Sequence, residues 1–347
     1  MSAAATALTT LRAGRRSRRR REAAVTAALA AALLGVGALS MTLGAFAIAP
    51  ADVVRVLLGG GEGIERFVVM DLRLPRLTLG LLVGAAFGVA GAVFQTVLGN
   101  PLASPDIIGI NWGASVAAAA GLLILGVTGA AVSLLAFGGA LAVAAAIYVL
   151  AWRDGVAGYR FVLIGVAVGF MASAVLNYLL TRSDVRDAQS ALVWLVGSLG
   201  GAGWDQIAVT GVALAVLMPA AAALAGSLRA LQLGDDAATG LGVRAERARL
   251  WLLVAAVGLA AAASAAAGPV AFVALVSAPI ARRIVGTGGL ALVPAALTGA
   301  LVVTLADLVA QHLLPGGVQP PVGVVTGVIG APYLLWLLAV SDRGGAG

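Results

Sequence analysis

The chain has 347 residues, of which 61% are hydrophobic and 11% are charged, and its mean hydropathy is +1.05. Because soluble domains carry about 25% charged residues, this composition excludes a soluble protein and indicates an integral membrane protein. The net charge is +7, there is no cysteine, and all 22 basic residues are arginine. A thiolate metal site is therefore excluded, and so is a P-loop, which needs lysine, so any ATP-driven step requires another polypeptide.

The chain begins with a basic segment, residues 1–22, which holds seven arginines within its first 21 residues. Such a run is typical of a positive-inside topology signal, so we expect a basic cytoplasmic tail and no nucleic-acid partner. The apolar run from Ala23 to Ala49 is much longer than the core of a signal peptide, about 7–15 residues. We therefore expect an uncleaved first span.

The apolar runs predict an all-α polytopic membrane protein with about ten transmembrane helices and one transmembrane domain over residues 23–342. An even number of spans returns the C-terminus to the N-terminal side, and arginine is more frequent on that side, so both termini are expected in the cytoplasm. Glycines four apart, at Gly84 and Gly88, Gly165 and Gly169, and Gly323 and Gly327, predict close helix packing. The predicted spans are residues 24–49, 77–98, 107–125, 129–151, 161–181, 205–226, 250–267, 271–285, 290–311 and 322–340.

Arg73 and Arg76 lie at the outer start of the second span. Arginine at this position can anchor a helix to lipid headgroups. However, the helix dipole disfavours a cation at a helix N-terminus, and arginine is scarce on the outer side. We interpret the pair as a site for an acidic partner surface.

A polar break follows the second span, where Asn100, Pro101 and Pro105 separate two apolar segments. The two prolines remove backbone donors and disfavour a helix just before each of them. Unpaired backbone groups within a membrane are tolerated only beside protein or water. We therefore interpret the break, with Gln95 just before it, as part of a pathway or gate; the alternative is an ordinary turn between helices.

The longest internal hydrophilic segment, about residues 229–249, is expected on the cytoplasmic side. Glycines at positions 234, 240 and 242 would break it into short helices. A compact knob of this kind would receive force from a separate ATPase, whereas the alternative is a solvated loop.

Asp307 is the one acidic residue deep within an apolar span, and His312, the only histidine, follows near the outer end of that span. Intramembrane carboxylates are costly and face a bundle interior or a cavity. A secondary transporter would use Asp307 for proton coupling, and a structural carboxylate would accept hydrogen bonds from a broken helix. His312 has no second histidine or cysteine nearby, so no metal site is expected.

Several ordered motifs together resemble those of the FecCD family, the permeases of bacterial ABC importers for ferric siderophores, haem and vitamin B12. The resemblance covers about residues 30–340. The motifs are Arg73-Leu-Pro-Arg76, Gly91-Ala-x-x-Gln95, Asn100-Pro-Leu-Ala-x-Pro105, Gly109-Ile-x-x-Gly-Ala114, Leu233-Gly-Asp with Leu241-Gly-Val243, Gly268-Pro-x-x-Phe-Val273, Ile280-Ala-Arg282, Ala306-Asp307, and Pro321-Val-Gly-Val-Val-Thr326 with Gly330-Ala-Pro332.

The resemblance implies a type II ABC importer permease fold and a ferric siderophore as cargo. It implies an ABC ATPase dimer that binds ATP and Mg, a second permease subunit, identical or different, and an extracytoplasmic siderophore-binding protein. This chain would be a non-catalytic subunit of the cytoplasmic membrane without a cofactor of its own. The implied site residues are Arg73, Arg76, Arg182 and Arg186 for binding-protein docking; Leu233, Gly234, Asp235, Ala238, Leu241, Gly242 and Val243 for ATPase coupling; and Gln95, Asn100, Pro101, Pro105 and Asp307 for the pathway or gate.

Three positions depart from the family pattern. Ala278-Pro279 shifts a proline by one position, Gln311 replaces an arginine found in many members, and Gln319-Pro-Pro321 begins the last span. Either one docking arginine is then missing, or its role falls to Arg182 or Arg186. Alternative functions are a proton-coupled secondary transporter that uses Asp307, a cobalamin or haem importer permease of the same family, and a structural or receptor-like membrane protein.

Overall fold

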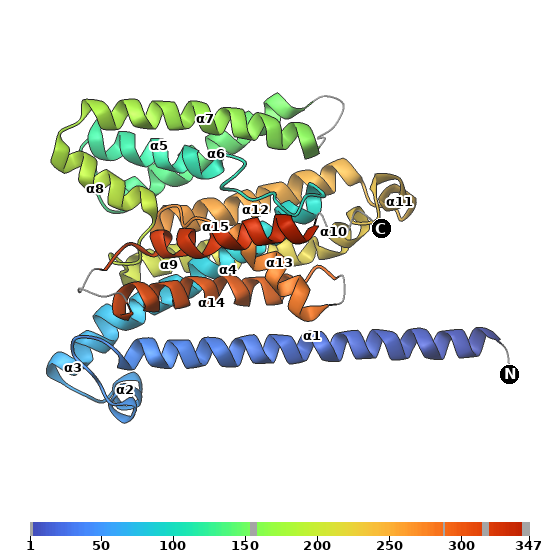
Figure 1. Cartoon of the computed structure of the whole chain (residues 1–347), viewed down its shortest axis with the longest axis horizontal. Helices are drawn as coiled ribbons and strands as arrows, with labels where there is room; N and C mark the ends of the chain where they lie inside the picture. The colour runs from blue at the N-terminus through green and yellow to red at the C-terminus, as the bar shows by residue number, and fades with distance from the viewer. Residues whose placement is uncertain (1–2, 153–157, 287–288, 314–318, 342–347) are drawn as a thin grey trace.

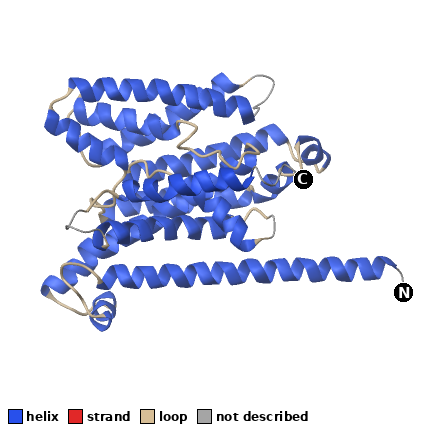
Figure 2. Cartoon of the chain, in the orientation of Figure 1, coloured by secondary structure: helices blue, strands red, loops and turns tan. Residues whose placement is uncertain are grey.

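The computed structural model describes residues 3–152, 158–286, 289–313 and 319–341, which form helices and loops without a strand (Figure 2). The predicted all-α fold is therefore confirmed. In chain order the helices are α1 (Ala3–Thr42), α2 (Pro50–Leu57), α3 (Gly63–Phe67), the π-helix η1 (Val68–Arg73), α4 (Leu74–Val97), α5 (Ile110–Leu123), α6 (Ala130–Ala151), α7 (Gly158–Arg182), α8 (Val185–Val196), α9 (Trp204–Ala223), α10 (Ala225–Leu231), α11 (Asp235–Gly240), α12 (Ala245–Ala267), α13 (Val273–Val285), α14 (Leu292–His312) and α15 (Val322–Ser341).

Each predicted span coincides with a helix in the described part of the chain: α1, α4, α5, α6, α7, α9, α12, α13, α14 and α15. By length and composition, 7 helical stretches among the described residues can cross a membrane, and they fall on α1, α3 to α4, α6, α7, α9, α12 and α14. α5 and α15 provide shorter apolar stretches, and α13 has 13 residues. The chain is therefore a multi-pass membrane protein.

α1 differs most from its predicted bounds. The basic residues expected as a tail form the first half of the same helix, because arginine is a good helix former and nothing stops the helix before the apolar run. The helix ends at Thr42 rather than Ala49, and Pro50 begins α2. Residues 1–2 and 342 of the predicted domains lie outside the described residues.

α4 and α12 form the centre of the bundle. Within the most apolar window of each span, 72% of the residues around α4 and 83% of those in α12 are buried, against 11% in α1 and 17% in α7. Figure 1 shows the consequence, because α1 and α7 lie on opposite flanks while α4 and α12 lie between them. A lipid-facing helix and a core helix thus share the same apolar composition.

Small residues allow α4 to approach α14 closely, as the glycine spacing predicts. A Cβ atom added to Gly84 or Gly88 would overlap backbone atoms of α14, at Gly299 and Ala295 respectively. Such close approach is the packing expected of small residues between membrane helices. The third spacing behaves differently, because Gly323 packs against Val196 while a Cβ at Gly327 would meet no atom of the described chain.

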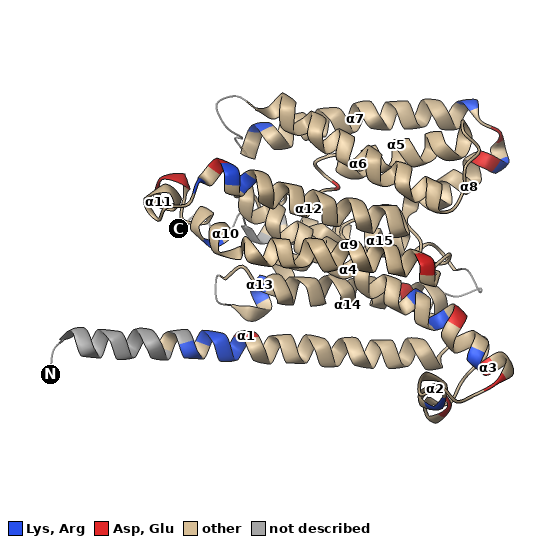
Figure 3. Ribbon diagram, turned by 180° about the vertical axis from the view of Figure 1, so that it is seen from behind, with Lys and Arg blue, Asp and Glu red and all other residues tan. Residues whose placement is uncertain are grey.

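The bundle has two polar ends, which we call outer and inner. The outer end carries α2, α3 and the connection from α7 to α8, and the inner end carries α10, α11 and the start of α1 (Figure 1). Figure 3 shows that coloured charged residues gather toward these ends and that the belt between them is largely uncoloured. This distribution fits a bilayer around the belt.

Candidate functional site

The outer end contains a cavity of about 440 Å³. Its walls come from the end of α1 and the loop after it, from η1 and the start of α4, from the loop after α8, and from the end of α14. The charged and polar side chains in its lining are Asp71, Arg73, Arg76, Asp307, Gln311, His312 and Gln319, besides two hydroxyl residues. Two of the four predicted docking arginines and the predicted intramembrane carboxylate therefore share one site.

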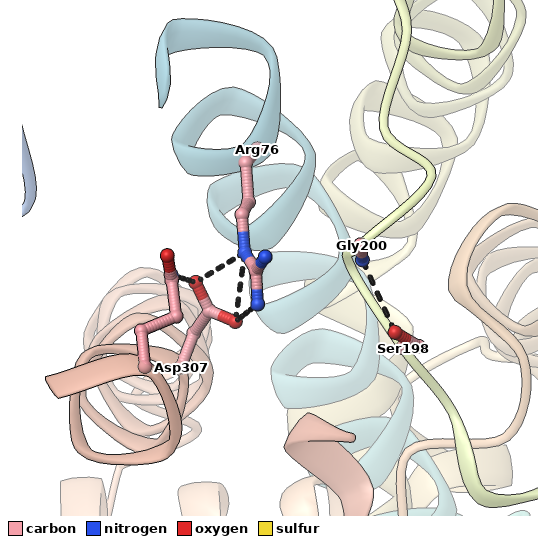
Figure 4. A network of polar contacts seen from close by, with 5 residues as sticks. Arg76, Ser198, Gly200 and Asp307 are labelled. Atoms are coloured by element: carbon pink, nitrogen blue, oxygen red, sulfur yellow. Dashed lines mark hydrogen bonds and ion pairs between the residues drawn. The ribbon is translucent and has the colours of Figure 1, made fainter. Parts of the chain in front are cut away.

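Arg76 of α4 and Asp307 of α14 form an ion pair in this cavity (Figure 4). The Arg76 Nη2 lies 2.8 Å from Oδ1 of Asp307, and Nε donates to Oδ2 at 3.0 Å. Gln311, one turn further along α14, donates its Nε2 to the same Oδ2 at 2.5 Å. Figure 4 also shows the adjacent loop, where the Gly200 amide donates to Ser198 at 3.1 Å.

This pairing changes the interpretation of three sequence positions. Arg76 was expected to face an acidic partner surface, and Asp307 was expected either to couple protons or to accept hydrogen bonds as a structural carboxylate. In the structure the two side chains are paired with each other. Gln311, which takes the place of an arginine, completes the hydrogen bonding of Asp307 instead of adding a positive charge. The three side chains together tie α4 to α14 at the outer end.

Arg73 is held differently, by the end of α1. Its Nη1 donates to the carbonyl oxygen of Met41 at 2.6 Å, and its Nη2 donates to that of Phe46 at 2.5 Å. Carbonyl groups at a helix C-terminus carry partial negative charge, so this contact suits a guanidinium. In the described residues Arg73 has no carboxylate partner within ion-pair distance, so it brings an unpaired positive charge to the cavity, whose lining also contains the carboxylate of Asp71.

The other predicted docking arginines lie elsewhere on the outer end. Arg182 ends α7 and Arg186 lies in the first turn of α8, both exposed, and neither lines the cavity. The structure therefore groups the four arginines into a cavity pair and a separate exposed pair. Docking at either pair stays a prediction.

The polar break after α4 is an ordered elbow. The Asn100 side chain accepts a hydrogen bond from the Leu102 amide at 2.9 Å, while Pro101 is exposed and Pro105 is buried. The carboxylate of Asp106 accepts the amide of Phe272 at 3.0 Å, just before α13. Asp106 was assigned no role from the sequence, because its partner lies 166 positions away in the chain.

Gln95 is buried between α4 and α13. Its Nε2 donates to the carbonyl oxygen of Leu275 at 2.9 Å, and its Oε1 accepts from Arg282 at 3.3 Å. Arg282 also donates to the Ala92 carbonyl at 3.1 Å and to the Thr96 hydroxyl at 3.0 Å. In this chain Gln95 joins two helices, and its part in a pathway stays a prediction.

The inner-end segment is folded, because α10 and α11 form two short helices before α12. Arg249 of α12 pairs with Asp235 at 2.8 Å and also with Glu246, which ties the start of α11 to α12. Gly234 and Gly242 have positive φ angles of 95° and 82°, so the chain turns at each end of α11, whereas Gly240 is the last residue of that helix. Ala238 is buried and Val243 partly buried, while Leu233 and Leu241 are exposed.

The chain matches the family model described as the FecCD transport family over residues 32–340. It is 40% identical to the ferric enterobactin transport system permease protein FepG of Escherichia coli (strain K12) over 91% of this chain and 95% of that protein. It is also 40% identical to the iron(3+)-hydroxamate import system permease protein FhuG of Bacillus subtilis (strain 168), over 86% and 92% of the two chains. A solved chain from an inward-facing metal-chelate type ABC transporter has a TM-score of 0.80 at 24% identity, covering 91% of this chain and 98% of that one.

Proposed function

The chain belongs to the FecCD transport family, and from this premise we propose that it is the membrane-spanning permease subunit of an ATP-driven ABC importer. The observation that carries the proposal is the extent of the family match, residues 32–340, which includes every helix from α2 to α14, the end of α1 and most of α15. The whole bundle, and not a single motif, therefore supports the assignment. The sequence excludes ATP hydrolysis by a P-loop in this chain, so a separate ATPase must supply the energy.

The cargo in this proposal is a ferric siderophore. The names of two relatives specify ferric enterobactin and iron(3+)-hydroxamate, two different iron(III) chelates, at the same 40% identity. Similarity of this degree supports the class of iron chelate and does not select one member of it. Cobalamin and haem importer permeases of the same family remain the alternative cargoes.

The inner end provides the surface that would contact the ATPase dimer. Exposed Leu233 and Leu241 flank α11, and the buried Arg249 fixes the direction of that helix through Asp235. An exposed apolar pair on a fixed support is the type of surface that docks a partner. In this proposal the inner end faces the ATPase in the cytoplasm, so the N- and C-termini also lie in the cytoplasm.

The outer end would receive a siderophore-binding protein. Arg73 contributes positive charge there, and Arg76 keeps a quarter of its side chain exposed despite its pair with Asp307. An incoming carboxylate can share the Arg76 guanidinium, because its five donors are not all used by Asp307. Docking would then act directly on the contact between α4 and α14.

α4 joins the two ends within one helix. Its 24 residues span about 36 Å and include both the Arg76 contact with α14 and the Gln95 contact with α13. The close glycine contacts with α14 make these helices move together when an ATPase acts on the inner end. A second permease subunit would complete the pathway, since one bundle packs its own centre with side chains.

The alternative of proton coupling at Asp307 has less support. A coupling carboxylate must release its proton to the transport path, but both Asp307 oxygens contact Arg76 and one also accepts from Gln311. This arrangement suits an anion held between two helices. The substitution Asp307→Asn tests the alternative, because proton-coupled uptake would stop and ATP-driven uptake would continue.

The test of the proposed function is mass spectrometry of proteins that co-purify with the tagged chain from its native membrane. We expect an ABC ATPase, and either no other permease, for a homodimer, or one paralogue, for a heterodimer. Uptake of a radioactive iron(III) chelate should then stop on ATP depletion and persist when the proton gradient is dissipated. A chain that purifies alone in several detergents and carries proton-dependent uptake would overturn the proposal.

A further inference from the structure

α1 has two halves that match two layers of a bilayer. Its apolar half, Ala23–Thr42, is about 30 Å long, which is the thickness of the hydrocarbon core. The arginine run ends at Arg21, just before this half. α1 lies along the edge of the bundle beside α14 (Figure 1), with 11% of its most apolar window buried, so lipid surrounds most of it.

Five arginines with described side chains, at positions 16 and 18–21, are exposed on this helix. None of them forms an ion pair within the described part of the chain. At about 100° per residue, they point in directions all around the helix and not along one face. A single protein surface cannot contact such a ring, whereas a layer of headgroups around the helix can.

Contacts between α1 and the end of α13 give an independent marker of the depth of the ring. Arg21 donates to the carbonyl oxygen of Ile284 at 3.4 Å, and a Cβ atom added to Gly286 would meet the Arg21 guanidinium. One residue before Ile284 on α13, the Arg283 guanidinium lies over the ring of Trp336 of α15, at 4.5 Å from its centroid.

Tryptophan and arginine in this arrangement are typical of the membrane–water interface. Arg21 therefore lies at the edge of the hydrocarbon core. Arg16 lies five residues further out, about 7.5 Å along the helix, and this distance matches the thickness of one headgroup layer, about 5–8 Å. The ring thus occupies the headgroup layer.

We propose that this arginine ring binds the phosphodiester headgroups of anionic phospholipids in the leaflet at the inner end, at the depth of Arg283 on α13. The guanidinium group presents paired donors that match phosphate oxygens. Anionic lipid then holds α1, the span with the smallest buried share, at a fixed depth against the end of α13. The proposal does not depend on the cargo or on the ATPase.

The test uses the full-length protein purified and placed in lipid nanodiscs that contain phosphatidylcholine with or without phosphatidylglycerol, followed by native mass spectrometry of retained lipid. Wild-type protein should retain phosphatidylglycerol at least about tenfold over phosphatidylcholine at low salt, and less at high salt because salt screens the attraction. Arg18→Gln with Arg19→Gln and Arg20→Gln should abolish a preference of this size, because the loss of roughly 1 kcal/mol for each arginine exceeds the free energy of a tenfold preference.

A matched control removes three exposed arginines from the outer end, by Arg66→Gln, Arg182→Gln and Arg186→Gln, and should keep the preference. The corresponding triple variant, Arg18→Lys, Arg19→Lys and Arg20→Lys, retains the positive charge that sets topology. It should keep most of the preference for phosphatidylglycerol. Wild-type protein that retains both lipids equally at low salt would overturn the proposal without any variant. So would a glutamine variant that keeps the lipid preference but loses a co-purifying ATPase, since the run would then be a protein contact.

Discussion

The two ends of the bundle are each held by an arginine, but the burial of the partners is opposite. At the outer end, Arg76 keeps 25% of its side chain exposed and Asp307 keeps 10%. At the inner end, Arg249 keeps 10%, whereas Asp235 keeps 56% and Glu246 keeps 43%. An arginine–carboxylate pair thus leaves its guanidinium the more exposed partner at the outer end, and its carboxylates the more exposed partners at the inner end.

The burial difference indicates what each end can accept. A partly exposed guanidinium above a buried carboxylate can be shared with an incoming acidic group. The buried guanidinium of Arg249, paired with more exposed carboxylates, mainly fixes the position of α11. The neighbouring leucines, Leu233 and Leu241, then remain free to make apolar contact with a partner. The outer end is therefore suited to charge recognition and the inner end to a fixed apolar contact.

The largest effect is expected for apolar contact at the inner end. Leu233→Asp combined with Leu241→Asp should lower affinity for the co-purifying ATPase by about 100-fold or more, because central apolar residues dominate docking energy. The midpoint of thermal unfolding should stay unchanged, since both side chains are exposed. Titration of the ATPase into the purified permease measures the affinity.

The matched control for this prediction is Leu58→Asp, which removes an exposed leucine from the end of α2 at the opposite pole. It should leave the ATPase affinity unchanged. Full ATPase affinity in the double variant would contradict the assignment of residues 233–243 to coupling, and with it the contrast between the two ends.

The next largest effect concerns the contact between α4 and α14 that joins the two ends. Gly88→Ala adds a methyl group that would overlap the backbone of Ala295, and overpacking of this kind costs about 1–3 kcal/mol. Gly327→Ala is the control, because a Cβ there meets no atom of the described chain. The 6 tryptophans allow unfolding to be followed by intrinsic fluorescence. Equal stability of the two variants would contradict a tight contact between α4 and α14.

Removal of Arg76 and removal of Arg249 should lower the free energy of unfolding by different amounts, and the difference between them is smaller than the effects above. Arg76→Met leaves the buried Asp307 carboxylate with Gln311 alone and should cost about 2 kcal/mol, since burial is incomplete. Arg249→Met leaves exposed carboxylates that water can solvate, and should cost less than about 1 kcal/mol. Thermal unfolding of both variants measures the difference, and a larger loss for Arg249→Met would reverse the burial argument.

Local sequence patterns predicted the helices and one closely packed helix face, because both depend on residues near one another in the chain. Apolar length located each span, and the spacing of Gly84 and Gly88 predicted close packing of α4, but it did not predict that α14 would be the partner. The first helix was divided into tail and span because charge changes at residue 22, yet arginine and alanine both favour helix and the backbone continues through both.

The polar contacts could not be predicted in the same way because they join residues far apart in the sequence. Arg76 and Asp307 are 231 positions apart, and each alone has a plausible separate role. Asp106 and Phe272 are 166 positions apart, and their contact depends on how the elbow after α4 reaches α13. The roles of the docking, coupling and pathway residues therefore stay predictions, although their positions are now known.

The smallest effect is expected for docking at the outer end, because charges at the rim of an interface change association rates more than affinity. Arg73→Glu should slow association of the siderophore-binding protein by about threefold and reduce the dependence of the association rate on salt, since part of the long-range attraction is lost.

Two further variants locate the attraction. Arg186→Glu, outside the cavity, should slow association less than Arg73→Glu if docking centres on the cavity, and equally if the whole outer end attracts the partner. Asp307→Asn should speed association, because Arg76 then keeps its positive charge without a carboxylate partner. Stopped-flow association rates at several ionic strengths separate these outcomes. Rates that are the same for wild type and Arg73→Glu at every ionic strength would show that the cation presented by the outer end does not recruit the partner, and the contrast between the ends would then concern stability alone.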